Sequence, residues 1–357
     1  MKTLLITGGA GFIGSHLCLI LLKNKYSLFV VDSYVNSSPE ALERVKFLSN
    51  QNKEYIKNNL MIFSGDLCDK NIIEKIFVYA KDIGRPIDAV IHLAGLKSVS
   101  ESIINPSSYW KNNVIATKNL LEIMMKNNCF TIVFSSSASI YETKSIIINE
   151  NSRIKANHPY ANTKIVIEGL LDQVFMDVPN KWRIVCLRYF NPIGAHSSGL
   201  IGEDPLGIPN NIFPRLLKVA SGNISNLTIF GNDWPTVDGS GVRDFIHVMD
   251  LAEAHLSALS MLFSQSPRIL KVNLGTGEGT SVLELIKTFE VTNKVKIPYI
   301  FSERRKGDSA IVVADNSLAK SIMEFSPKRN ISEMCRDGWR WFMNNPKGYN
   351  KKIKIKR

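Results

Sequence analysis

The sequence predicts an α/β fold in which a doubly wound parallel sheet is followed by a smaller C-terminal α/β lobe. In the first half, short apolar runs rich in β-branched residues alternate with amphipathic stretches, which is typical of βαβ units around a buried parallel sheet. After about residue 190 the sequence becomes rich in turn dipeptides such as Asn191-Pro192 and Asp204-Pro205. The 357 residues suffice for two such units at about 150 residues each.

The same patterns predict individual strands and helices in chain order. The predicted strands of the first unit are residues 2–7, 27–32, 60–66, 88–95, 131–135 and 183–189. The predicted helices are residues 12–23, one that begins after Pro39, residues 107–126 and residues 160–176. Later, residues 227–230 are predicted as a strand, and residues 243–263 as a strand and a helix. We expect a first domain of residues 1–190 to which 243–263 return, a second of 191–346, and a basic tail of 347–357.

The composition is that of an ordered globular protein with an excess of basic groups. Apolar residues make up 45% and charged residues 21%, which excludes a disordered, collagen-like or coiled-coil chain. The net charge is +12, and six basic residues lie within the tail of residues 347–357. A solvated terminus explains such a run, and a polyanionic partner is the alternative. Because no recognisable nucleic-acid-binding module accompanies the charge, we expect no nucleic-acid partner.

Cysteine and histidine spacing predicts neither a metal centre nor a disulfide framework. The five cysteines are odd in number and form no Cys-x-x-Cys pair, which is typical of a reducing compartment. The six histidines show no His-Glu-x-x-His spacing, and no run of 18 apolar residues predicts a membrane span. We therefore expect a cytoplasmic protein without a metal and without a membrane partner.

A glycine-rich loop joins the first predicted strand to the first predicted helix. Gly8 permits a tight turn, Gly11 lets a pyrophosphate approach the helix N-terminus, and Gly14 lets the helix pack closely on the strand. A merely structural turn is the alternative. The strand before the loop and the helix after it favour a dinucleotide site, and hence a Rossmann-type first domain.

Acidic and small residues end the next predicted strands at the edge where such a sheet holds its ligand. Asp32 stands 18 residues after Gly14, where its carboxylate can accept hydrogen bonds from a ribose diol and would repel a 2′-phosphate. This favours NAD over NADP, although an aspartate here can also simply cap the next turn. The residues that end the third and fourth strands, and are also predicted to line the cofactor site, are Asp66, Leu67, Leu93, Ala94 and Gly95.

The predicted chemical groups are Tyr160 and Lys164, four residues apart on one helix face, and Ser137 at the end of the fifth strand. A free tyrosine has a pKa of about 10, and a neighbouring ammonium favours its phenolate. Lys164 is therefore expected to lower the pKa of Tyr160, and Ser137 to share its proton. Ser135 and Ser136 are expected to bond to the backbone, and Tyr141 to serve in packing.

These motifs resemble the extended short-chain dehydrogenase/reductase family over nearly the whole chain, and within it the enzymes that invert UDP-sugars at C4. The stretches specific to those enzymes are residues 94–97, 188–196, 202–205, 207–211, 230–233 and 241–248. Two departures are Glu142, where the family usually has glycine, and Ala161, which replaces a frequent glycine.

The resemblance implies binding residues for NAD and for a UDP-sugar. Those implied for NAD are Phe12, Ile13, Asp32, Asn36, Asp66, Leu67, Lys97, Asn112, Tyr160, Lys164 and Phe190. Those implied for the UDP-sugar are Ser137, Asn191, Asn211, Ile212, Thr228, Ile229, Phe230, Arg243, Phe245, Arg305 and Asp308. Arginines suit this role, because a guanidinium group can donate two parallel hydrogen bonds to the oxygens of a diphosphate.

The resemblance also implies a reaction and an assembly. UDP-glucose and UDP-galactose would be interconverted by transient oxidation at C4, with NAD as a regenerated hydride store and the 4-keto sugar turning over in its pocket. A homodimer packed through residues 107–126 and 160–176 is expected. The alternatives are a 4,6-dehydratase, a UDP-glucuronate decarboxylase and an idle NAD sensor. A dehydratase is disfavoured because it needs an acidic pair where this chain has Ala138 and Ser139.

Val312 is expected to influence the range of sugars. The resemblance implies that family members with a bulky aromatic residue at this position accept only the glucose and galactose forms, whereas members with a smaller residue also accept N-acetylhexosamines. Valine would then admit UDP-N-acetylglucosamine. The alternative is that Val312 only continues an apolar core strand of residues 311–313.

Overall fold

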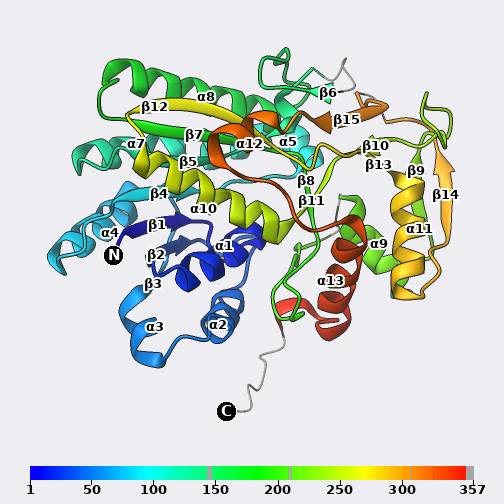
Figure 1. Cartoon of the computed structure of the whole chain (residues 1–357), viewed down its shortest axis with the longest axis horizontal. Helices are drawn as coiled ribbons and strands as arrows, with labels where there is room; N and C mark the ends of the chain where they lie inside the picture. Colours follow the sequence, from blue (N-terminus) through cyan, green and yellow to red (C-terminus); the bar gives the residue numbers. More distant parts are fainter. Residues whose placement is uncertain (143–146, 208, 210, 306, 351–357) are drawn as a thin grey trace.

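The computed structural model describes residues 1–142, 147–207, 209, 211–305 and 307–350. Its larger lobe is a twisted parallel sheet between two layers of helices, and its smaller lobe lies beyond one end of that sheet (Figure 1). Of the predicted features, Ile208 and Asn210 and the part of the basic tail after residue 350 lie outside the described residues.

The central sheet has seven parallel strands in the order β12-β7-β5-β4-β1-β2-β3. The strands are β1 (Thr3–Thr7), β2 (Ser27–Asp32), β3 (Leu60–Ser64), β4 (Ala89–His92), β5 (Thr131–Ser137), β7 (Arg183–Tyr189) and β12 (Arg268–Leu274). The chain reverses direction across the sheet between β1 and β4, which is the switch point where doubly wound folds bind ligands. The predicted Rossmann-type sheet is confirmed.

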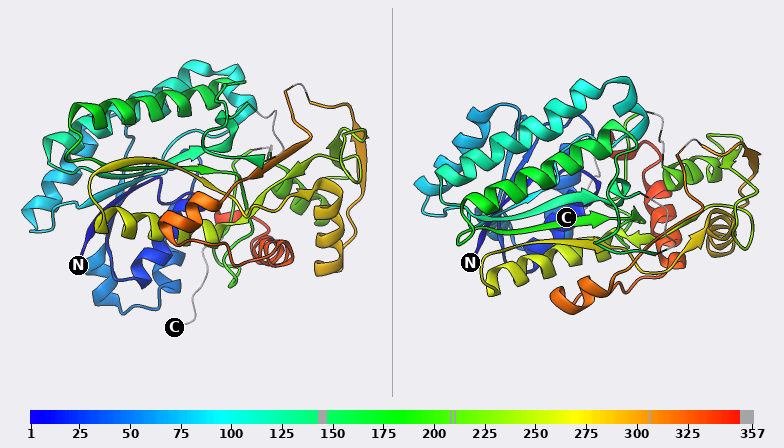
Figure 2. Two further views of the ribbon diagram at one scale, coloured as in Figure 1. Left: turned by 45° about the horizontal axis from the view of Figure 1, so that its top comes forward. Right: turned by 90° about the horizontal axis from the view of Figure 1, so that it is seen from above.

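Helices cover both faces of the sheet because successive side chains of its strands point to opposite sides (Figure 2). Leu4 and Ile6 of β1 pack with α1 (Phe12–Lys23) and α10 (Val248–Ser264) on one face. Leu5 packs in the other core, with α4 (Lys70–Asp82), α7 (Ala116–Lys126) and α8 (Pro159–Asp177). The smaller helices of this lobe are α2 (Pro39–Leu48), α3 (Lys53–Asn59), α5 (Val99–Ile104), α6 (Pro106–Tyr109) and α12 (Ser317–Met323).

Two parts of the larger lobe differ from the sequence prediction. The predicted helix of residues 107–126 is divided by a π-helical turn over Trp110–Ile115, between α6 and α7. There the side chain of Asn113 accepts from the backbone N–H of Leu96 (2.8 Å) and donates to its carbonyl (3.1 Å). The apolar spacing used to predict the helix contains no sign of this contact. Residues 268–274 form edge strand β12 of the central sheet, although we expected them in the second lobe. The predicted domain boundary at residue 190 stays a prediction.

Among the described residues, the smaller lobe consists of three α-helices and several short strand pairs. Its helices α9 (Ile212–Ala220), α11 (Val282–Asn293) and α13 (Ile331–Asn344) enclose an apolar core that includes Phe213 and Phe289. Parallel pairs form between β8 (Asn191–Ile193) and β11 (Phe245–His247) and between β9 (Leu227–Phe230) and β14 (Tyr299–Ser302). A four-stranded sheet has the order β13 (Thr280–Ser281), β10 (Val242–Arg243), β15 (Ile311–Ala314) and β6 (Ile147–Ile148).

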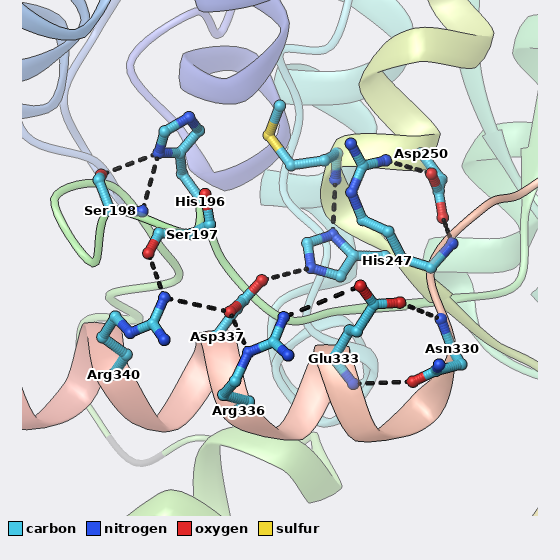
Figure 3. A network of polar contacts seen from close by, with 12 residues as sticks. His196, Ser197, Ser198, His247, Asp250, Asn330, Glu333, Arg336, Asp337 and Arg340 are labelled. Carbon is cyan, nitrogen blue, oxygen red and sulfur yellow. Dashed lines mark hydrogen bonds and ion pairs between the residues drawn. The ribbon is translucent and has the colours of Figure 1, made fainter.

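Polar and charged side chains join the two lobes between α13 and the start of α10 (Figure 3). His247 caps α10 by accepting from the backbone N–H of Met249 at 3.0 Å, and its other ring nitrogen lies 3.6 Å from Asp337 of α13. Arg329, just before α13, pairs with Asp250 in the first turn of α10. These contacts fix the second lobe to the helix that returns to the sheet.

The buried histidines predict how the stability of the fold depends on pH. Burial lowers the pKa of His16 and His92 to about 3 and that of His255 to about 4. In the unfolded chain these rings bind protons near pH 6.5, so their contribution to stability is complete above that value and is lost as the pH falls. Each of these histidines should lower the free energy of unfolding by about 1.4 kcal/mol per pH unit once the pH is well below 6.5.

We therefore expect the free energy of unfolding to fall steeply between pH 6 and pH 5. In His92→Gln, the free energy of unfolding, measured with urea at several pH values, should depend less steeply on pH, by the contribution of about one proton-binding group. This holds even if the variant is less stable than the wild type at pH 8. An unchanged slope would show that His92 does not titrate on unfolding.

Candidate active site

The glycine loop is held against three strands at the carboxyl edge of the sheet. Gly8 has a φ of 70°, and a Cβ there would lie 2.8 Å from the backbone nitrogen of Ala94 beyond β4. A Cβ on Gly14 would lie 2.3 Å from the carbonyl oxygen of Gly8. The tight turn and the close approach of α1 to this loop therefore both require glycine.

The start of α1 has the properties of an anion site. Gly11 is its N-cap, with extended backbone angles and no side chain that caps the helix. A Cβ at Gly11 would meet only the carbonyl oxygen of Gly8, at 3.3 Å, so the space above the first turn is open. Uncapped first-turn N–H groups, including those of Phe12 and Ile13, are ready donors for a phosphate, and the residues present fit a dinucleotide pyrophosphate.

Asp32 both caps a turn and braces the glycine loop. Its Oδ1 accepts from the backbone N–H of Tyr34 (2.9 Å) and from the Ser37 hydroxyl (2.8 Å), and its Oδ2 accepts from the N–H of Ala10 (2.9 Å). Three of about four lone-pair positions are used, so the carboxylate can still accept from a ribose hydroxyl. The two roles considered for Asp32 from the sequence are thus compatible.

The other predicted cofactor residues are distributed around the same edge of the sheet. Asp66 is exposed after β3 and accepts from the N–H of Cys68, whereas Leu67 is buried. Leu93 and Ala94 are half-buried after β4, Gly95 is exposed, and Phe190 is buried after β7.

Three polar residues predicted to bind the cofactor, Asn36, Asn112 and Lys97, also have protein partners. Asn36 is exposed and accepts from the N–H of Leu206, and Asn112 donates to the carbonyl of Ser108. Lys97 makes an ion pair with Glu203 at 2.9 Å, with its Nζ 5.9 Å from the centre of the Phe12 ring. The Lys97–Glu203 pair therefore links the loop after β4 to the segment of residues 202–205.

The predicted chemical groups meet where α8 begins beside the end of β5. His158 caps α8 by accepting from the N–H of Ala161 at 3.1 Å, and its ring stacks on that of Tyr160 at 5.9 Å between centroids. Lys164 donates to the carbonyl of Ser135 at 2.7 Å, with its Nζ 5.9 Å from the centre of the Tyr160 ring. His158 was not singled out from the sequence, although its place before Pro159 at a helix start is an N-cap signal.

The pKa shifts of Tyr160 and Lys164 differ from what we expected from the sequence. Burial raises the pKa of Tyr160, and its hydrogen bond with the Ser137 hydroxyl only partly opposes this. Burial likewise lowers the pKa of Lys164 to about 8, against the charge of Glu168. The ammonium bonds to the backbone of β5 and faces the tyrosine ring, so desolvation determines the direction of the shift on Tyr160.

The expected roles of two neighbouring residues, Ser136 and Tyr141, also need correction. The Ser136 hydroxyl donates to the carboxylate of Glu168 at 2.6 Å, not to the backbone. Tyr141 is buried, but its hydroxyl donates to Asn273 at 2.7 Å and accepts from Arg188. Of the two family departures, Ala161 is fully buried in α8, and Glu142 makes ion pairs with Arg153 and Lys155 at 3.3 and 3.5 Å.

The arginines predicted to bind substrate lie in the smaller lobe. The guanidinium of Arg305 lies 3.8 Å from the centre of the Phe230 ring. Arg243 lies 3.9 Å from Asp308 and donates to the carbonyl of Ser309 at 3.0 Å. Burial lowers the pKa of both arginines, and Arg215 of α9, which sequence reasoning missed, adds a third positive charge that acts on Arg305.

Alternation along the strands separates the remaining predicted substrate residues. Thr228 and Phe230 are half-buried on one face of β9, whereas Ile229 points into the core of the smaller lobe with Phe245. The side chains of Ile229 and Phe245 therefore face this core, because neighbouring strand residues point to opposite sides, and their predicted contact with the substrate stays a prediction.

Three further residues keep positions compatible with the prediction. Asn191 is half-buried and donates to the carbonyl of Asp244 at 3.0 Å. Asn211 is the exposed N-cap of α9, and Ile212 is its half-buried first residue.

Comparison with known proteins gives a consistent result. The family described as the NAD dependent epimerase/dehydratase family matches residues 4–275. UDP-glucose 4-epimerase 2 of Arabidopsis thaliana is 48% identical over 350 residues, which cover 98% of this chain and 97% of that protein.

Solved structures agree over the same length. UDP-glucose 4-epimerase from Bifidobacterium longum in complex with NAD+ and UDP is 42% identical, with a TM-score of 0.89, and the match covers 97% of this chain and all of that one. The UDP-Glc/GlcNAc 4-epimerase from Campylobacter jejuni is 30% identical, with a TM-score of 0.82 over 96% of this chain and all of that one.

The glycine geometry predicts opposite results for two substitutions. Gly14→Ala places a methyl group against the backbone of residues 8 and 9, so we expect a loss of several degrees in melting temperature. Gly11→Ala has one tight contact, with the carbonyl oxygen of Gly8 at 3.3 Å, so it should lower the melting temperature of the protein stripped of dinucleotide much less than Gly14→Ala. It should nevertheless weaken binding of NAD, because its methyl group occupies the approach to the N–H groups of α1. Calorimetry with and without NAD measures both, and equal behaviour of the two variants would contradict these roles.

Proposed function

We propose that the chain, which belongs to the NAD dependent epimerase/dehydratase family, interconverts UDP-glucose and UDP-galactose with NAD as its cofactor. This proposal rests on the near full-length similarity to UDP-glucose 4-epimerases, combined with Ser137, Tyr160 and Lys164 at the junction of β5 and α8, on the same carboxyl edge of the parallel sheet as the glycine loop. The reaction is an isomerisation, because the sugar is oxidised and reduced at the same carbon. NAD supplies the oxidant, and in its reduced form the reductant, for that carbon.

The residues of the chain then divide into three tasks. The backbone of the glycine loop and Asp32 hold the dinucleotide. In its phenolate form Tyr160 takes the proton of the sugar 4-hydroxyl, becomes a phenol, and later gives the proton back; Ser137 holds that hydroxyl in position by hydrogen bonding. Arg243 and Arg305 anchor the diphosphate, so the sugar can turn over while the UDP end stays bound.

A dehydratase or an idle sensor is a weaker proposal for this site. Ser137 is followed by Ala138 and by Ser139, which accepts from the Ser137 hydroxyl at 2.9 Å. Two small residues therefore stand where elimination of water would need an acidic pair. The proton-transfer residues are all present in α8 and β5, which argues against an idle binding protein.

A homodimer is the assembly we propose, packed through the helices of residues 107–126 and 160–176. Large apolar side chains are exposed on α5 and the π-helical turn that follows α6, including Ile104, of which 75% is exposed, Ile103, Trp110 and Ile115. A cluster of this kind on a soluble lobe is typical of a protein interface.

We also propose a cytoplasmic location, without a metal or nucleic-acid partner. All five cysteines are free thiols, four of them buried, which suits a reducing compartment. Within the part of the chain that the structure describes, no helix is long and apolar enough to cross a membrane.

The proposed chemistry predicts the behaviour of Tyr160→Phe. The substitution removes the proton acceptor but keeps the ring that stacks on His158, so fold and NAD content should be unchanged. Turnover of UDP-galactose to UDP-glucose, measured without net formation of NADH, should fall by about 10² to 10⁴. Turnover near that of the wild type would remove Tyr160 from the mechanism.

The range of sugars depends on Val312, for which both sequence interpretations remain compatible with the structure. Val312 pairs in register with Arg243 and is half-buried against the cluster that contains Ala138 and Phe190. It thus continues an apolar strand beside the proposed sugar site. We propose that UDP-N-acetylglucosamine and UDP-N-acetylgalactosamine are also substrates, as the name of the Campylobacter jejuni relative indicates for its own N-acetylated sugar.

The expected result is that the wild type turns over UDP-N-acetylgalactosamine and that Val312→Tyr selectively loses this activity while keeping UDP-galactose. A steric clash should separate the two values of kcat/KM by at least about tenfold. A wild type that ignores the acetylated sugar would contradict the assignment, and Val312→Thr controls for substitution without added bulk.

A further inference from the structure

A row of buried polar residues crosses three neighbouring strands close to Ser137. Ser136 of β5, Arg188 of β7 and Asn273 of β12 lie directly beside one another in register. Each is at most 1% exposed. Such positions in a parallel sheet covered on both faces are normally apolar, so this row needs a specific explanation.

Glu168 of α8 joins the first two members of the row. Its carboxylate accepts from the Ser136 hydroxyl at 2.6 Å and forms a two-pronged ion pair with Arg188, at 3.0 Å from Nε and 2.7 Å from Nη2. The remaining Nη1 of Arg188 donates to Tyr141 at 2.7 Å, and Tyr141 in turn donates to Asn273 at 2.7 Å. Both carboxylate oxygens of Glu168 therefore accept hydrogen bonds.

Stability alone does not account for this pair. Burial of two charges carries a desolvation cost that their attraction often fails to exceed, and apolar side chains of similar volume are commonly as stable. The position of Glu168 suggests another reason. It lies one helical turn after Lys164, on the same face of α8. Lys164 donates to the carbonyl of Ser135 and Glu168 accepts from Ser136, so consecutive turns of the helix hold consecutive residues that lead to Ser137.

The charges around Lys164 leave Glu168 as its main electrostatic support. On β4, His92 is neutral at pH 7 because burial lowers its pKa to about 3. On β7, burial keeps Cys186 a neutral thiol by raising its pKa, and Arg188 is engaged by Glu168 itself. On α8, Tyr160 is a neutral phenol by the same cause. The carboxylate of Glu168 thus opposes the desolvation of the ammonium.

We propose that Glu168 is a positioning residue for the Tyr160–Lys164 pair, which keeps the buried Lys164 charged and fixes the end of β5, while Arg188 and Ser136 hold its carboxylate in place. The inference rests on the proposed function, because its importance follows from proton transfer at Tyr160. Glu168 itself touches neither substrate nor cofactor in this proposal.

The test compares Glu168→Gln with the double variant Glu168→Gln/Arg188→Met. The single variant leaves a buried arginine without its carboxylate and should be strongly destabilised. The double variant removes both charges, keeps the Tyr141–Asn273 hydrogen bond and should recover most of the melting temperature. If the ion pair were purely structural, the double variant would recover the epimerase activity of the wild type as well.

Two measurements distinguish positioning from structure. NMR titration of isotope-labelled lysine side chains, with the Lys164 signal identified by its loss in Lys164→Arg, should show the pKa of Lys164 about one unit lower in the double variant than in the wild type. The alkaline limb of the kcat profile with UDP-galactose should move to lower pH by a similar amount, with little change in KM.

The outcomes separate this proposal from the proposed function. A double variant whose Lys164 titration and pH profile match those of the wild type would overturn the positioning role. A wild type that binds NAD but does not convert UDP-galactose would overturn the proposed function, whereas the shift in Lys164 titration would still support the role of Glu168 in holding that charge.

Discussion

The contact between the start of α1 and the loop after β1 is the constraint on which the site depends. Gly14 lies so close to residues 8 and 9 that no side chain fits, and a Cβ on Gly8 would also clash with the backbone beyond β4. The same loop is bonded to β2, through Gly8 to the carbonyl of Val31 at 2.8 Å and through Ala10 to Asp32. Three strand ends therefore converge on one point, and the direction of α1, with its uncapped N–H groups, follows from them.

The position of the smaller lobe depends on the return of the chain to the sheet. β11 pairs with β8 immediately before α10 begins, so the strand that precedes the returning helix also anchors the segment after β7. β10, one residue earlier, sets Arg243 beside Val312 of β15. The cations of the smaller lobe are thus connected through short strand pairs to α10, and α10 packs on α1. A substrate held by Arg243 would be placed relative to the glycine loop by this route.

Local sequence signals were sufficient for much of the sheet and of the chemistry. β2, β7 and α1 match their predicted bounds because a continuous apolar run, or an apolar stripe with helical spacing, is a strong local pattern. The division of the helix at Trp110–Ile115 was missed because it depends on the pairing of Asn113 with Leu96, which lies far away in sequence. β12 was missed because four of its seven residues are only half-buried, as suits an edge strand. The Glu168–Arg188 pair carries no local signal, since its meaning depends on the strand order that places Ser136 beside Arg188.

The motif Tyr-x-x-x-Lys names the reacting pair but not the groups that set its charge. Burial disfavours charge on both members, since it raises the pKa of the phenol and lowers that of the ammonium. The opposing contributions come from other elements: the Ser137 hydroxyl at the end of β5 acts on Tyr160, and the Glu168 carboxylate on the next turn of α8 acts on Lys164. Without these neighbours, burial would move the pKa of both groups further toward their neutral forms. The chemical unit of this site is therefore the junction of β5 with two turns of α8, and its properties follow from the sheet that holds those elements together.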